Sequence, residues 1–82
     1  MFYVYVLYSD SYDRLYIGMT IDLSYRLDEH NKGQNKSTKA YLPWIMIHSE
    51  ELPSRILARE KEIKLKSSSG RRFIRKNYLT IN

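Results

Sequence analysis

Two apolar runs flank a short polar interruption near the start of the chain. Residues 2–9 and 15–20 are rich in Tyr, Val and Ile, which favour strands, and "DSYDR" (10–14) lies between them. A polar turn between two apolar runs of strand-favouring residues is typical of a hairpin. The pattern therefore predicts two strands that pair antiparallel.

The next segment, 21–33, changes from a two-residue to a helical period. Asp22 is a typical N-cap residue, and Gly33 is a typical residue after a helix end. Leu23 and Leu27 are four residues apart and so lie on one helical face. We expect a helix that packs through these two leucines.

The remainder of the chain predicts one more strand and two helices. A loop over 34–43 leads to a strand at 44–50, and Pro53 then precedes a helix at about 55–67. A last short helix is expected within 71–79. The order β-β-α-β-α with a small terminal helix predicts the α/β class.

The length and cysteine content restrict the kind of protein. A chain of 82 residues predicts one domain over 1–82, with a thin core. The absence of cysteine excludes a disulfide framework and a cysteine-ligated zinc site. No apolar run approaches the roughly 20 residues of a membrane span. We expect a cytoplasmic protein that does not act at a membrane.

Positive charge is in excess and is concentrated in two segments. The net charge is +5, and 32–39 and 64–76 carry basic residues without acidic ones. Such a balance favours a phosphate-rich partner, although solubility alone is an alternative explanation. The candidate nucleic-acid contacts are Lys32, Lys36, Lys39, Lys64, Arg71 and Arg72.

The second strand combines a tyrosine and a glycine on one face. Side chains alternate along a strand, so Tyr16 and Gly18 lie on one side, and Leu15, Ile17 and Met19 lie on the other. Glycine in a strand often marks the close approach of a ligand or of another backbone. A bulge, or room for a helix, is the alternative explanation.

The second helix contains an acidic residue in an apolar pattern. Ile56, Leu57 and Ile63 define a stripe, and Glu60 falls between them at about 100° per residue. A buried carboxylate is normally paired or bound to a metal ion. We therefore expect Glu60 on the core face as a metal ligand, with an ion pair to Lys64 as the alternative.

These motifs together resemble the GIY-YIG nuclease superfamily, and most closely its small stand-alone bacterial members. The matching residues are Tyr5, "YIG" at 16–18, Thr20, Asp22-Leu23, Arg26, His30 and "REKEIK" at 59–64. The resemblance implies a small three-stranded antiparallel sheet flanked by helices. It also implies hydrolysis of DNA phosphodiesters with one divalent ion, Mg²⁺ or Mn²⁺.

The resemblance assigns roles to particular residues. Tyr5, Tyr16, Arg26 and His30 match catalytic positions of the family, and Glu60 matches its metal-binding glutamate. Arg26 and His30 are four apart on one helical face, a pair suited to an anion. Gly18 would let the substrate approach closely. Either tyrosine is a candidate base.

The sequence thus predicts a metal-dependent DNA endonuclease in the repair or processing of DNA structures. One alternative is a nucleic-acid-binding module with the same fold that does not cleave, or cleaves only with a partner protein. Another is a small protein-interaction domain. RNA as a substrate and a homodimer as the assembly stay open.

Overall fold

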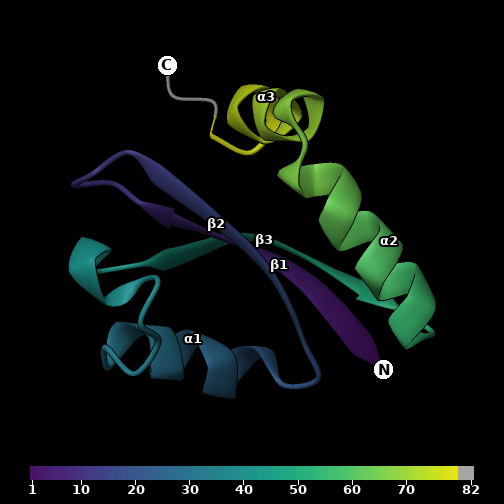
Figure 1. Ribbon diagram of the computed structural model, residues 1–82, viewed down its shortest axis with the longest axis horizontal. Coiled ribbons are helices and arrows are strands. Elements are labelled where there is room, and N and C mark those ends of the chain that lie inside the picture. Colours follow the sequence, from purple (N-terminus) through teal and green to yellow (C-terminus); the bar gives the residue numbers. More distant parts are fainter. Residues whose placement is uncertain (80–82) are drawn as a thin grey trace.

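The computed structural model describes residues 1–79 as a three-stranded antiparallel sheet with three α-helices (Figure 1). The strand order is β2-β1-β3, so the first strand is central. The predicted fold class and the β-β-α-β-α-α order are confirmed. The elements are β1 (Phe2–Ser9), β2 (Arg14–Thr20), α1 (Leu23–Asn31), a 3₁₀ turn η1 (Lys39–Tyr41), β3 (Ile45–Leu52), α2 (Arg55–Lys66) and α3 (Ser68–Asn77).

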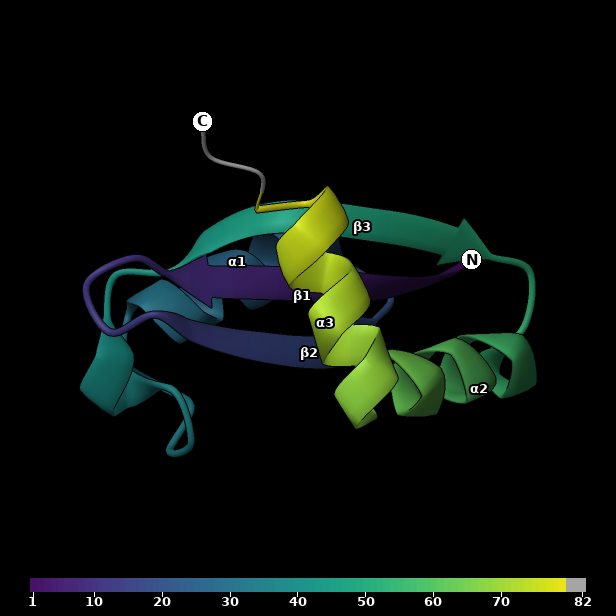
Figure 2. The same ribbon diagram turned by 90° about the horizontal axis from the view of Figure 1, so that it is seen from above.

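The sheet separates two cores because β1 is apolar on both faces. On one face Val4 and Val6 pack with Ile17 and with residues of α2 and α3. On the other face Tyr5 and Leu7 pack with Trp44 and with residues of α1. Figures 1 and 2 show the same division, with α1 on one side of the sheet and α2 and α3 on the other.

Helix α1 begins and ends where its sequence signals predict. The Asp22 side chain accepts a hydrogen bond from the Tyr25 backbone N–H at 3.0 Å. Gly33, just beyond the helix, has a φ of 74°, a left-handed conformation that favours glycine. Leu23 and Leu27 pack toward the sheet as expected.

The rotation of α2 about its axis differs from the expected one. Ile56 and Ile63 are 72% and 56% exposed, so the predicted apolar stripe faces solvent. The buried residues of this helix are instead Ala58, Glu62 and Leu65. The expectation that Glu60 lies on the core face is therefore wrong, because its side of the helix is exposed.

Helices α2 and α3 make a close contact at the end of α2. The Ser67 side chain accepts a hydrogen bond from the Gly70 N–H, so α3 begins at Ser68 and not at the predicted 71. A Cβ on Gly70 would collide with the backbone carbonyls of Lys64 and Leu65. Only glycine permits this approach, and Leu65 packs in the core with Val4 and Val6.

The two basic segments lie on opposite sides of the sheet. Residues 32–39 connect α1 to η1, whereas most of 64–76 forms α3 and the end of α2 (Figure 1). They do not form one continuous surface. None of the helices within 1–79 has the length and apolar character needed to span a membrane.

Gly18 is expected to be required by the core. It pairs with Tyr5 across β1 and β2, and a Cβ there would lie 2.5 Å from the Tyr5 hydroxyl oxygen. Overpacking of this kind costs about 1–3 kcal/mol. Gly18→Ala should therefore lower the free energy of unfolding in urea, although alanine ordinarily suits a strand better than glycine does.

Gly33→Asn is the matched control for this measurement. A Cβ on Gly33 would meet its nearest neighbours at 3.8 Å, and asparagine tolerates the left-handed conformation. This variant should remain close to the parent. A Gly18→Ala protein as stable as the parent would show that the Tyr5 ring can move aside.

Candidate active site

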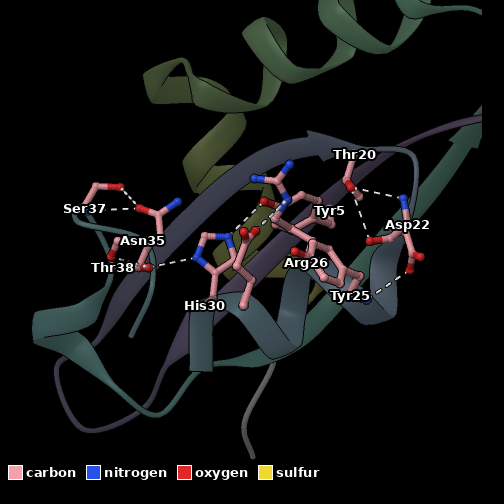
Figure 3. A network of polar contacts seen from close by, with 10 residues as sticks. Tyr5, Thr20, Asp22, Tyr25, Arg26, His30, Asn35, Ser37 and Thr38 are labelled. Carbon is pink, nitrogen blue, oxygen red and sulfur yellow. Dashed lines mark hydrogen bonds and ion pairs between the residues drawn. The ribbon is translucent and has the colours of Figure 1, made fainter. Parts of the chain in front are cut away.

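Four of the predicted catalytic residues gather beside the central strand. Tyr5 comes from β1, Tyr16 from β2, and Arg26 and His30 from α1. The Tyr16 ring centroid lies 4.8 Å from that of His30 and 6.2 Å from that of Tyr5. Figure 3 shows Tyr5, Arg26 and His30 converging from the strand and the helix.

A buried chain of hydrogen bonds connects Tyr5, His30 and Thr38. The Tyr5 hydroxyl lies 3.0 Å from His30 Nε2, and His30 Nδ1 lies 2.8 Å from Thr38 Oγ1. The Thr38 hydroxyl donates its proton to the Asn35 carbonyl oxygen. It must then accept from His30 Nδ1–H, which leaves Nε2 as the acceptor for the Tyr5 proton.

Burial keeps both members of the Tyr5–His30 pair neutral. Burial raises the pKa of the Tyr5 hydroxyl well above its usual range, and Tyr16 raises it further. Burial lowers the pKa of His30, and the positive charge of Arg26 lowers it further. At pH 7 the site therefore holds a phenol beside an imidazole that can accept its proton.

The Arg26 guanidinium has a buried N–H donor that is not used in a hydrogen bond within the described residues. Its Nε lies 3.5 Å from Glu29 Oε1, but this buried atom has no hydrogen-bond partner among residues 1–79. A cavity of about 200 Å³ adjoins Arg26 and is also lined by Thr20 and Arg55. An arginine with an unused donor at the edge of a cavity is suited to binding an anion.

The buried carboxylate of α2 is Glu62, and α2 lies on the opposite face of the sheet from α1. Glu62 is 7% exposed, and its charge contributes to raising the pKa of Tyr5. Arg59 lies 2.8 Å from Glu62 Oε1, and Lys66 lies 3.1 Å from Oε2. Glu60 is exposed and makes no ion pair within the described residues, so the alternative pairing with Lys64 is absent there.

A metal ion would have few protein ligands here. Within residues 1–79 there is no group of three or more His, Cys, Asp or Glu that could hold a metal ion. Mg²⁺ often uses only one or two carboxylates and keeps several waters, and substrate phosphates complete its shell. Glu62 would supply one carboxylate to such a site, in competition with its ion pairs to Arg59 and Lys66.

The remaining predicted contacts are more dispersed. Gly18 gives its space to the Tyr5 ring, which accounts for the glycine without a substrate. Lys32 is paired with Asp28 at 2.8 Å, and Arg71 Nε donates to the Lys66 carbonyl oxygen. Lys36, Lys39, Lys64 and Arg72 are exposed.

Three hydrogen bonds that the sequence did not reveal fix the loop after α1. The Trp44 indole N–H donates to the Thr38 carbonyl oxygen at 2.9 Å. Asn31 holds the Trp44 backbone through both atoms of its amide. These bonds hold Thr38 in place beneath His30, and no local pattern in 34–43 signals them.

Comparison with known proteins identifies the family. The model of the GIY-YIG catalytic domain matches residues 1–77. The chain belongs to the GIY-YIG family. Members of this family typically use a divalent metal ion.

Two UPF0213 proteins are similar to this chain over most of its length. A UPF0213 protein of Pediococcus pentosaceus is 38% identical over 84 residues, covering 98% of this chain and 87% of its own. A UPF0213 protein of Natronomonas pharaonis is 37% identical over 68 residues, which cover 82% of this chain and 79% of its own. No solved structure shows significant similarity.

The lowered pKa of His30 predicts a pH-dependent stability. The unfolded chain binds this proton at about pH 6.5, whereas the folded GIY-YIG domain resists it, so stability should fall as the pH falls below that value. Each unit of pKa depression corresponds to about 1.4 kcal/mol. In urea unfolding at pH 7, 6 and 5, the free energy of unfolding should fall less with decreasing pH for His30→Gln than for the parent.

His48→Gln is the companion variant, because it measures what the other histidine adds to the pH dependence. Equal losses for the parent and His30→Gln would mean that His30 can be protonated in the folded protein at little cost.

Proposed function

We propose that this GIY-YIG domain is a metal-dependent endonuclease that hydrolyses phosphodiester bonds in DNA. The observation that carries the proposal is the chain Tyr5–His30–Thr38, with hydrogen bonds of 3.0 and 2.8 Å, beside Arg26 and its unused donor. It combines a proton acceptor with an anion-binding group in one place. This combination suits attack on a phosphate, and simple binding does not need it.

Arg26 and Tyr16 are the groups that would meet the phosphate first. Both are partly exposed, whereas Tyr5 and His30 are buried. Arg26 would hold the phosphoryl oxygens, whose negative charge grows in the transition state. Its charge is most useful in a site that is partly shielded from water.

Tyr5 would act as a proton relay and not as a free phenolate. Its raised pKa prevents ionisation at neutral pH, but its proton already lies on the bond to His30 Nε2. As a water oxygen attacks phosphorus, the water's proton passes to the Tyr5 oxygen and the Tyr5 proton passes to His30. The bond from phosphorus to the leaving oxygen then breaks.

Glu62 replaces Glu60 as the residue we propose for the metal. A Mg²⁺ or Mn²⁺ ion at its carboxylate would supply Lewis acidity and stabilise the leaving oxygen. Arg59 and Lys66 would orient this carboxylate in the absence of substrate. Both cations are substantially exposed, so they can move aside at modest cost.

One observation favours the non-cleaving alternative. Both oxygens of Glu62 are already engaged by cations, and those two ion pairs compete with any metal ion. A binding module would keep this arrangement and use Arg26 with the basic segments to hold nucleic acid. The two functions differ in whether Glu62 is needed for anything beyond folding.

Two matched substitutions separate the functions. Glu62→Gln should nearly abolish metal-dependent cleavage, because a neutral amide is a poor ligand for a hard cation. It should also remove the line broadening that Mn²⁺ causes in NMR signals around Tyr5. Glu60→Gln, which removes an exposed charge from the same helix, should retain both activity and broadening.

Cleavage of labelled duplex, branched and single-stranded DNA, with Mg²⁺, with Mn²⁺ and with EDTA, is the assay. The reverse result, an active Glu62→Gln and an inactive Glu60→Gln, would return the metal to Glu60. A parent that binds DNA but cuts no substrate with either ion would favour the binding module.

The salt dependence of DNA binding should come more from the basic segment 32–39 than from the basic segment 64–76. Residues 34–39 adjoin the site through Thr38, whereas Arg71 and Arg72 lie on the far side of the sheet. Each phosphate contact contributes about 0.9 to the slope of log affinity against log salt. Lys36→Ala with Lys39→Ala should flatten this slope by about 2.

The matched pair Arg71→Ala with Arg72→Ala should leave the slope nearly unchanged. If the Arg71 and Arg72 pair flattens the slope instead, DNA lies across α3 and the proposed approach to the site is wrong.

A further inference from the structure

A row of aromatic rings leads from the candidate active site to the protein surface. Tyr16 lies 6.4 Å from Trp44, Trp44 lies 6.5 Å from Tyr41, and Tyr41 lies 5.4 Å from Tyr12, all between ring centroids. Trp44 is buried, but Tyr12 is 53% exposed. The row therefore begins beside His30 and ends in solvent at the β1–β2 turn.

The outer end of this row combines aromatic and cationic groups. The Arg14 guanidinium lies over the Tyr41 ring, 4.3 Å from its centroid. Tyr12 meets Tyr41 at an interplanar angle of 76°. An edge-to-face contact uses at most one face of the Tyr12 ring, so the other face is available. We call Tyr12, Arg14 and Tyr41 the aromatic platform.

The chemistry of this platform matches an unpaired nucleotide base. Exposed aromatic rings and arginine guanidinium planes are the groups on which proteins stack single-stranded bases. Lys39, at the start of η1, adds a positive charge close to Tyr41 for the nucleic-acid backbone. A paired base inside a duplex has no free face to offer.

We propose that the aromatic platform stacks an unpaired base of the nucleic-acid strand whose phosphate is held by Arg26, at the opposite end of β2 from that phosphate. This inference rests on the proposed nuclease function and names its substrate class. That class is DNA with unpaired nucleotides, such as a single strand, a flap or a fork. Three centroid separations of 5.4 to 6.5 Å lie between Tyr16 and Tyr12, so the stacked base is several nucleotides away from the site.

Two features of the turn bear on this proposal. Asp13 accepts hydrogen bonds from Tyr8 and Arg75, so its charge is largely compensated. Asp10 is exposed and would oppose the approach of a phosphate. The alternative role of the platform is structural, because the Tyr12–Tyr41 contact joins η1 to the hairpin.

Binding is measured with a single-stranded oligonucleotide that contains 2-aminopurine, in EDTA so that nothing is cleaved. Stacking quenches the fluorescence of this base. Tyr12→Ala should lower single-strand affinity by about 5- to 100-fold and abolish the quenching. Tyr12→Phe keeps the ring and should retain both, and blunt duplex should bind the parent and Tyr12→Ala equally.

Tyr25→Ala is the matched control, since Tyr25 is a tyrosine of α1 that is 63% exposed. It should bind the probe as the parent does. Arg14→Ala is the second variant, chosen because it leaves the Tyr12 ring intact if Tyr12→Ala unfolds. It should also weaken single-strand binding.

The proposal is overturned if Tyr12→Ala binds the single strand like the parent. It is overturned equally if single-strand and duplex affinities fall together, or if Tyr25→Ala loses as much as Tyr12→Ala. A parent that binds and quenches the probe but never cuts would refute the nuclease function and leave the platform intact.

Discussion

The hydrogen bond between the Tyr5 hydroxyl and His30 Nε2 is the interaction on which the site depends. It joins the central strand to α1 across a core that is otherwise apolar. A buried polar pair is tolerated only when its members satisfy each other. That requirement explains why Gly18 must lack a side chain, and why Thr38 is held beneath the imidazole by its bonds to Trp44 and Asn35.

A second constraint sets the position of Glu62. Helix α3 can pack closely against the end of α2 because Gly70 has no side chain, and the buried residues of α2 are Ala58, Glu62 and Leu65. The two helices therefore bring an acid to the sheet, and α1 brings Arg26 and His30 from the opposite side. The β2 strand lies between them as a shared edge, since α2 packs on it from one face and Tyr16 and Gly18 face α1 from the other.

The sequence predicted the elements well because they depend on local patterns. The two strands of the hairpin, the Asp22 cap and the inward-facing Leu23–Leu27 pair are all confirmed. The larger apolar residues of α2 predict the wrong inward face for Glu60, because the helix buries Ala58, Glu62 and Leu65. Glu62 has cations at i−3 and i+4, Arg59 and Lys66, and this spacing is the sequence pattern that indicates its ion pairs. Thr38 could not be found, since its place depends on contacts distant in sequence.

The tautomer of His30 tests the account most directly, because the relay requires Nε2 to be free of a proton. A ¹⁵N-resolved NMR spectrum of the imidazole at pH 7 distinguishes the two ring nitrogens. We predict a neutral ring that carries its proton on Nδ1, bonded to Thr38, with Nε2 accepting from Tyr5. A proton on Nε2, or a charged ring with protons on both nitrogens, would contradict the relay from Tyr5 to His30.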